Sequence, residues 1–135
     1  HCRVTCTGRA GLTLLLRALR TLAPAERDEV VIPSYTCFSV AASVVKAGLR
    51  PRLVDVDAET LDFDIADLEG TDYRRVLAII ATNLYGLPND VPRVAALVGS
   101  RAVEVDPRGG PGLGDRHDAR GSRQQRPGVC AERHG

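Results

Sequence analysis

Residues 28–57 read DEVVIPSYTCFSVAASVVKAGLRPRLVDVD, and this stretch decides the fold. Its β-branched run EVVI is stopped by Pro33, as expected of a buried strand. Residues 37–48 predict a helix with Gly48 as its C-cap, and residues 50–57 predict a second strand that ends in acids. Because parallel neighbours need a crossover between them, a strand–helix–strand order indicates a parallel pair.

The same alternation continues on both sides of this stretch. Further helices are expected at residues 8–23 and 90–99, a short helix within residues 60–70, and further strands at residues 74–82 and 101–105. The runs EVVI and VLAII are apolar without alternation, which is typical of strands covered on both faces. The sequence therefore predicts α/β architecture with a mainly parallel sheet. Ligands of such sheets usually bind beyond the carboxyl ends of the strands.

Length, charge and cysteine content exclude several classes of protein. The 135 residues suffice for one domain with a modest core. A formal net charge of +1 makes nucleic acid an unexpected partner, and no apolar run reaches the roughly 18 residues of a membrane span. Four cysteines are too few for a secreted disulfide framework, which favours the cytoplasm. A zinc site split between Cys2/Cys6 and Cys130/His134 is disfavoured by its loose spacing.

Each short motif has both a structural and a ligand-binding interpretation. TGRAG, residues 7–11, can cap a helix or hold a phosphate on its backbone N–H groups. PSYTC, residues 33–37, can cap the next helix or present its tyrosine as a stacking surface. VDVDAETLDFD, residues 54–64, does not have the spacing of a calcium loop, so solvated acids are expected. NLYGLPND, residues 83–90, can close a turn or direct its asparagine and tyrosine into a site.

Taken in order, these segments resemble the start of the DegT/DnrJ/EryC1/StrS family of sugar aminotransferases, which depend on pyridoxal 5'-phosphate (PLP) and have PLP fold type I. The resemblance is carried by TGRAGLTLLLRAL, by DEVVIPSYTCFSVAASVVKAGLRPRLVDVDAETLDFDIADLE and by VLAIIATNLYGLPNDV. It extends from about Cys6 to Val105. It implies that residues 1–106 are an incomplete large domain, a partial three-layer sandwich around a mainly parallel sheet.

The resemblance also implies a cofactor site. Gly8, Arg9 and Ala10 fall on the segment whose backbone amides hold the PLP phosphate in the family, with Arg9 in place of a commoner threonine. Cys37 falls where many relatives place an aromatic residue over the pyridine ring. A thiol cannot stack as a ring does, so either Phe38 or Tyr35 is expected to take that role. Asn83 falls beside the site, near the end of a strand.

The implied activity is amino transfer, usually from glutamate, to a keto-sugar nucleotide, by an enzyme that is generally a homodimer. In the family, the acid on the pyridine nitrogen and the Schiff-base lysine lie downstream of the matched region. The single lysine of this chain, Lys46, lies in a predicted helix in the wrong region. The chain as given is therefore predicted to be an inactive fragment. The alternatives are a non-enzymatic binding module with a basic tail and a sugar dehydratase relative that uses pyridoxamine phosphate.

The tail, residues 107–135, has a different character. It holds seven glycines, six arginines and three prolines with few apolar residues, so it is predicted to be disordered. An out-of-frame tail would also explain why the family motif expected here is missing. Back-translated and read one nucleotide later, RGGPGLG permits Glu-Ala-Ala-Gln-Ala-Leu-Gly. That is close to the Glu-Asp-Ala-Ala-Gln-Ala-Leu-Gly expected here from the family. The competing interpretation is a genuine Arg/Gly-rich tail that binds RNA or a partner.

Overall fold

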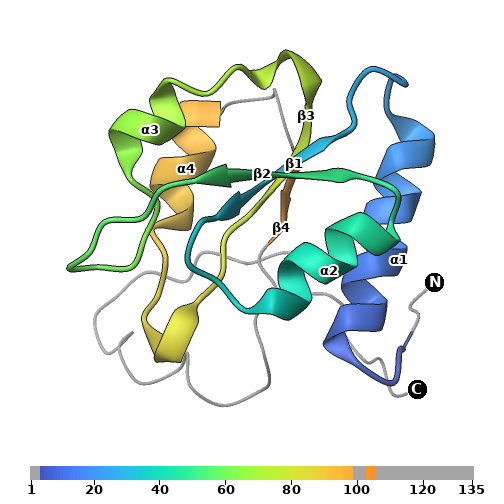
Figure 1. The fold of residues 1–135 in the computed structure, drawn as a ribbon, viewed down its shortest axis with the longest axis horizontal. Helices are drawn as coiled ribbons and strands as arrows, with labels where there is room; N and C mark the ends of the chain where they lie inside the picture. The colour runs from blue at the N-terminus through green and yellow to red at the C-terminus, as the bar shows by residue number, and fades with distance from the viewer. Residues whose placement is uncertain (1–3, 99–102, 106–135) are drawn as a thin grey trace, which may run out of the picture.

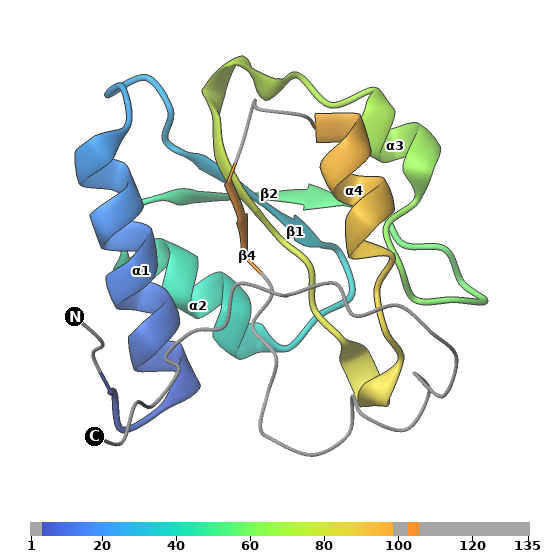
Figure 2. The same ribbon diagram turned by 180° about the vertical axis from the view of Figure 1, so that it is seen from behind.

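The computed structural model describes residues 4–98 and 103–105 of the chain. Four parallel strands form one sheet in the order β2-β1-β3-β4, with α1 and α2 on one face and α3 and α4 on the other (Figures 1 and 2). This arrangement confirms the predicted three-layer α/β fold. The elements are α1 (Gly8–Leu22), β1 (Glu29–Pro33), α2 (Phe38–Lys46), β2 (Arg50–Val54), α3 (Ile65–Glu69), η1 (Tyr73–Arg75), β3 (Val76–Ile80), η2 (Leu84–Gly86), α4 (Val91–Val98) and β4 (Val103–Val105).

Several predictions from the sequence concern residues that the structure does not describe. The tail expected to be disordered or out of frame, residues 107–135, is one of them. Three members of the disfavoured zinc site, Cys2, Cys130 and His134, are also outside it. The described cysteines, Cys6 and Cys37, are both exposed free thiols.

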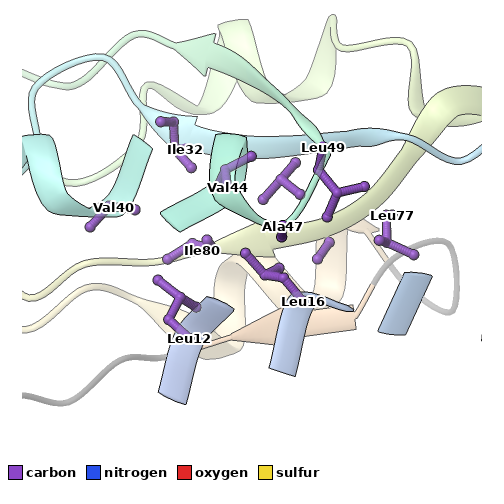
Figure 3. Close-up of a cluster of buried hydrophobic side chains, with 11 residues drawn as sticks. Leu12, Leu16, Ile32, Val40, Val44, Ala47, Leu49, Leu77 and Ile80 are labelled. Carbon is purple, nitrogen blue, oxygen red and sulfur yellow. The ribbon is translucent and has the colours of Figure 1, made fainter. Parts of the chain in front are cut away.

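A first apolar cluster fills the space between the sheet and helices α1 and α2 (Figure 3). Leu12 and Leu16 lie four residues apart on α1, so they share the face of the helix that packs against the sheet. Leu16 is completely buried, whereas Leu22, the last residue of the same helix, is 83% exposed. Val44 of α2 and Ile32 of β1 meet Leu16 in this cluster.

A second apolar cluster lies on the other face of the sheet, under α3 and α4. Its members from the helices include Leu68 and Val94, and Phe63 joins them from the segment before α3. Strand β3 contributes to both clusters because successive side chains of a strand point to opposite faces. Every residue of β3 is buried, as predicted for a strand that is covered on both faces.

An irregularity in the pairing of β1 with β3 changes this alternation. The register passes from Glu29 opposite Val76 to Val30 opposite Ala78, which leaves Leu77 without a partner on β1. An extra residue of this kind locally bends a strand and increases its twist. Leu77 and Ala78, although adjacent in sequence, therefore both belong to the first cluster.

The short helix predicted within residues 60–70 is α3, which begins at Ile65 and ends at Glu69. Before it, the Asp57 carboxylate accepts hydrogen bonds from the backbone N–H groups of Glu59 and Thr60, at 3.0 and 2.8 Å, and fixes a turn. Leu61 follows with a φ of 60°, which a helix cannot contain.

A charged network ties the strands together at their amino ends. Glu29, whose side chain is 9% exposed, accepts from Arg50 Nη2 at 3.1 Å and from Arg52 Nη1 at 2.9 Å, both on β2. Asp28 accepts two hydrogen bonds from Arg75 Nη2 at 2.8 and 2.9 Å. These bonds link the starts of β1, β2 and β3 at the end of the sheet opposite the strand carboxyl ends.

We expect Glu29→Gln to lower the free energy of unfolding by about 1–2 kcal/mol, because it weakens two charge-assisted hydrogen bonds of a buried carboxylate. The loss is limited because Arg50 and Arg52 are 61% and 39% exposed and can be solvated by water. Urea unfolding monitored by circular dichroism measures it. Glu26→Gln, at an exposed position nearby, serves as the matched control. Equal losses in the two variants would contradict a stabilising role for the network.

Candidate functional site

The loops that follow the strands meet the amino ends of α1 and α2 at one edge of the sheet (Figures 1 and 2). Hydrogen bonds hold the loop after β1 against the segment after β2: Ser34 Oγ donates to Asp55 Oδ1 at 2.9 Å, and the Ser34 N–H donates to Val54 O at 2.8 Å. Thr36 Oγ1 and Thr82 Oγ1 are 3.3 Å apart, which joins the same loop to the end of β3. The carboxyl edge therefore gathers polar groups, as the strand order predicted.

The start of α1 presents two backbone donors that are not used within the protein. Thr7 is the N-cap: its hydroxyl accepts from the Ala10 N–H at 3.2 Å, and its carbonyl accepts from the Gly11 N–H at 3.1 Å. Within residues 4–98 and 103–105, the N–H groups of Gly8 and Arg9 have no acceptor. Of the three predicted phosphate-binding positions, two are thus free to bind an anion, and Ala10 is engaged by the cap.

Space around these donors is open. A Cβ placed at Gly8 would meet no atom within 4 Å, so a ligand can approach the backbone there. At Gly11, by contrast, a Cβ would lie 3.1 Å from Thr5 Oγ1, so this glycine allows close packing of the preceding segment. The positive end of the helix dipole favours an anion at this point.

Arg9 combines a fixed backbone with an uncommitted side chain. Its carbonyl accepts from Thr13 Oγ1 at 2.9 Å. Ser43 Oγ of α2 donates to Ser39 O at 2.8 Å and lies 3.5 Å from the Arg9 carbonyl oxygen, where the two helices approach. Its guanidinium is exposed and forms no ion pair with any residue that the structure describes. The positive charge of Arg9 contributes to lowering the pKa of Cys37, so the two predicted site residues interact electrostatically.

Cys37 occupies the N-cap position of α2 and is exposed. Its Sγ lies 3.0 Å from Ser39 Oγ. The pKa of the thiol lies below its ordinary value, chiefly because the Ser39 hydroxyl hydrogen-bonds to it, with smaller contributions from the Ser39 backbone N–H and the Arg9 charge. Phe38, 80% exposed, and Tyr35, 51% exposed, are the nearby aromatic residues available to stack on a ring.

We expect Cys37 to be alkylated by iodoacetamide at a lower pH in the wild-type chain than in Ser39→Ala. Removing the hydroxyl takes away the largest cause of the lowered pKa, so the reactive thiolate forms only at higher pH. Mass spectrometry of the Cys37 peptide after timed alkylation at a series of pH values gives the midpoint. Thr21→Ala, which removes a hydroxyl from the exposed end of α1, is the control. An identical midpoint in Ser39→Ala and wild type would refute the assignment.

Asn83 uses its side chain largely to close its own loop. Its Oδ1 accepts from the Asn89 N–H at 2.9 Å, and Asn89 Nδ2 donates to Thr82 O at 2.7 Å. Asn89 Oδ1 is buried and has no partner within the described part of the chain. The turn-closing interpretation of this motif therefore has direct support, while the Asn83 amide nitrogen remains available to a ligand.

The acids of residues 54–64 act within the protein. Asp57 accepts the bonds of its turn, and the Val56 N–H and the Ser34 hydroxyl lower the pKa of Asp55. In the part of the chain that the structure describes, no three His, Cys, Asp or Glu side chains are grouped to hold a metal ion.

A groove of about 670 Å³ between residues 57–66 and residues 88–93 lies toward the face of the sheet that α3 and α4 cover.

Comparison with known proteins identifies the family of the chain. The sequence profile of the DegT/DnrJ/EryC1/StrS aminotransferase family matches residues 1–105. The chain belongs to this family. Its members and structural neighbours are PLP-dependent enzymes, so PLP is the cofactor of the family.

Individual relatives show how similar this chain is in sequence and in structure to known enzymes. The UDP-N-acetyl-3-dehydro-alpha-D-glucosamine 3-aminotransferase of Acidithiobacillus ferrooxidans is 38% identical over 96 residues, 71% of this chain and 26% of that protein. The sugar aminotransferase CalS13 from Micromonospora echinospora superposes with a TM-score of 0.62 at 31% identity, covering 73% of this chain and 28% of its own. For GDP-4-keto-6-deoxy-D-mannose-3-dehydratase of E. coli, solved with bound hydrated PLP, the TM-score is 0.63 at 25% identity, with coverages of 73% and 26%.

The chain therefore spans little more than a quarter of the length of these relatives. Among the described residues, no helix is long and apolar enough to cross a membrane.

Two features of the site were not predicted from the sequence. Tyr35 and Tyr85 were singled out separately, but no motif indicated that they form a pair. Thr82 and Ser39 were not singled out at all, because a threonine at a strand end and a serine in a helix are common in any domain.

Proposed function

We propose that this chain is the N-terminal part of a PLP-dependent sugar aminotransferase. The complete enzyme would transfer an amino group from glutamate to a keto-sugar nucleotide and would act as a cytoplasmic homodimer. The observation that carries the proposal is the pair of uncommitted N–H groups at Gly8 and Arg9, on the segment that the family match covers.

The residues at this edge fit the phosphate of PLP. The N–H groups of Gly8 and Arg9 would donate to phosphate oxygens, the dipole of the 15-residue α1 would favour the negative charge, and the Arg9 guanidinium would add a positive charge. When bound, PLP supplies the electron sink on which amino transfer depends. Cys37 and its aromatic neighbours would contribute to the environment of the ring, and Asn83 would supply an amide nitrogen from the loop after β3.

Lys46 does not fit the role of the lysine that anchors the cofactor. It lies at the last residue of α2, exposed, whereas the candidate site lies at the first turn of that helix. Its carbonyl accepts from Arg17 Nη2 at 2.9 Å, which makes it part of the contact between α1 and α2. We therefore propose that the chain as given binds the cofactor phosphate weakly and does not catalyse transfer.

A second candidate is a sugar dehydratase of the same family, favoured by the likeness to the E. coli dehydratase. The residue at the position of the anchoring lysine discriminates the two enzymes. We also retain the proposal that residues 107–135 are out of frame. Sequencing the coding DNA across and beyond these codons tests both, because an open shifted frame that reaches the anchoring position identifies that residue.

Titration of the 135-residue chain with PLP tests the cofactor site. Because the sequence contains no tryptophan and three tyrosines, quenching of tyrosine fluorescence reports binding near Tyr35 and Tyr85. We expect saturable quenching that inorganic phosphate reverses. Lys46→Arg is the matched control: it removes the single lysine, so quenching that persists does not come from reaction of PLP with that amine. Absence of saturable quenching would contradict the proposed cofactor site.

A further inference from the structure

Two tyrosines from different loops meet across the candidate site. Tyr35 follows β1 and Tyr85 lies in η2 after β3, and their hydroxyl oxygens are 3.0 Å apart. The two loops run side by side below the sheet in Figure 1 and again in the reverse view of Figure 2. Both rings are open to solvent, at 51% and 78% exposure, so the contact is not a consequence of burial.

The backbone at Tyr85 is strained in a way that brings this contact about. Its φ is 53° and its ψ 20°, in the left-handed region that a bulky residue adopts only at a cost, and Gly86 follows with a φ of 81°. The Leu87 N–H closes the turn on Leu84 O at 2.8 Å. A turn of this shape ordinarily uses glycine or asparagine at such a position. The residue at this position is a tyrosine, and its hydroxyl reaches the other loop.

The pair brackets residues already placed at the candidate site. Tyr35 lies two positions before Cys37, and Tyr85 lies two positions after Asn83. The bond between Thr36 and Thr82, part-buried at 3.3 Å, is a second link between the same loops. Two links fix both the separation and the relative rotation of the loops, which a single bond cannot do.

We propose that Tyr35 and Tyr85 are positioning residues, whose hydroxyl bond holds the loops after β1 and β3 at a fixed separation so that Cys37 and Asn83 flank the cofactor ring. The role in cofactor positioning rests on the proposed function, whereas the coupling of the loops does not. The Tyr35 hydroxyl also raises the pKa of Tyr85, as expected for a phenol that donates to a neighbour.

Hydrogen exchange in the ligand-free chain tests the coupling. The Leu87 amide reports on the loop of Tyr85, and the Ser34 amide, bonded to Val54 O, reports on the loop of Tyr35. We expect Tyr35→Phe to speed exchange at Leu87, in the other loop, by about threefold to tenfold, the size expected for one lost hydrogen bond. Tyr85→Phe should do the same at Ser34. The double variant should show no further increase, because both changes remove one bond.

Tyr73→Phe is the control for loss of a phenol hydroxyl. Tyr73 donates to Leu68 O at 2.6 Å, before β3 and away from the two loops. It should leave exchange at Ser34 and Leu87 unchanged. Exchange that stays at the wild-type rate across the loops in both single variants, or that increases independently in the double variant, would overturn the proposal.

PLP affinity in the same variants separates this inference from the proposed function, and it is measured by equilibrium dialysis because the substitutions remove the fluorescent tyrosines. We expect the dissociation constant to rise by about threefold to tenfold in each single variant and no further in the double variant. If the variants change exchange across the loops but the wild-type chain does not bind PLP, the proposed function is contradicted. The coupling of the loops is then still supported. Wild-type binding with unchanged affinity in both Phe variants would overturn the positioning role alone.

Discussion

Leu16→Ala should lower the free energy of unfolding by about 3–5 kcal/mol, the largest loss we expect from any single substitution in α1. Leu16 has no exposed surface and lies between the helix and the sheet, in contact with the cluster that holds Val44 and Ile32. Truncation removes the transfer free energy of the side chain and leaves a cavity that close-packed neighbours fill only in part. Urea unfolding followed by circular dichroism measures the loss.

Leu22→Ala is the matched control, since it makes the same chemical change in the same helix at a side chain that is 83% exposed. Its effect should stay within about 0.5 kcal/mol. Similar losses in the two variants would mean that α1 does not dock on the sheet by the face that carries Leu16. That result would also undermine the candidate site, because docking of α1 places the Gly8 and Arg9 amides at the carboxyl edge.

Arg9→Glu should weaken PLP binding by about tenfold to hundredfold, the size expected when a charge-assisted contact to phosphate is lost. The substitution replaces an uncommitted cation beside the free N–H groups with an anion that repels the phosphate. It should not destabilise the fold, because an acid in the first turn of a helix is favourable by about 0.3–1 kcal/mol. Reduced affinity together with unchanged or increased stability is therefore the expected signature, measured by fluorescence titration and urea unfolding.

Arg93→Glu controls for the change in net charge. Arg93 lies in α4, on the other face of the sheet from α1. The control should leave PLP affinity within about twofold of wild type, since surface charges separated by more than about 10 Å are largely screened at moderate salt. Equal loss in both variants would indicate that PLP responds to overall charge and not to a site at α1.

The fold could be predicted because its central elements depend on patterns that the sequence displays. The uninterrupted apolar runs of β1 and β3 indicated strands covered on both faces, and both are buried along their whole length. The short helix within residues 60–70 was predicted, but the residue at which it begins was not. The Asp57 carboxylate fixes a turn before α3 by its bonds to nearby amides, and these bonds are decided by side-chain geometry. Hydrophobic periodicity carries no information on such bonds.

Single residues of the candidate site could be proposed from the sequence, but their arrangement could not. Position beyond the strand ends and the family resemblance pointed to Gly8, Cys37 and Asn83, and their role toward a cofactor remains a prediction. The contact between Tyr35 and Tyr85 depends on a left-handed backbone at a tyrosine, which sequence rules assign to glycine. Such exceptions to local preference are expected where ligands bind.

The charged network of Asp28 and Glu29 and the candidate site lie at opposite ends of the same strands. Substitutions at groups so far apart and without shared partners combine additively. The loop residues can therefore vary without weakening the bonds that hold the strand starts together. The division gives the scaffold evolutionary freedom: new ligand preferences can arise at one end while the other preserves foldability.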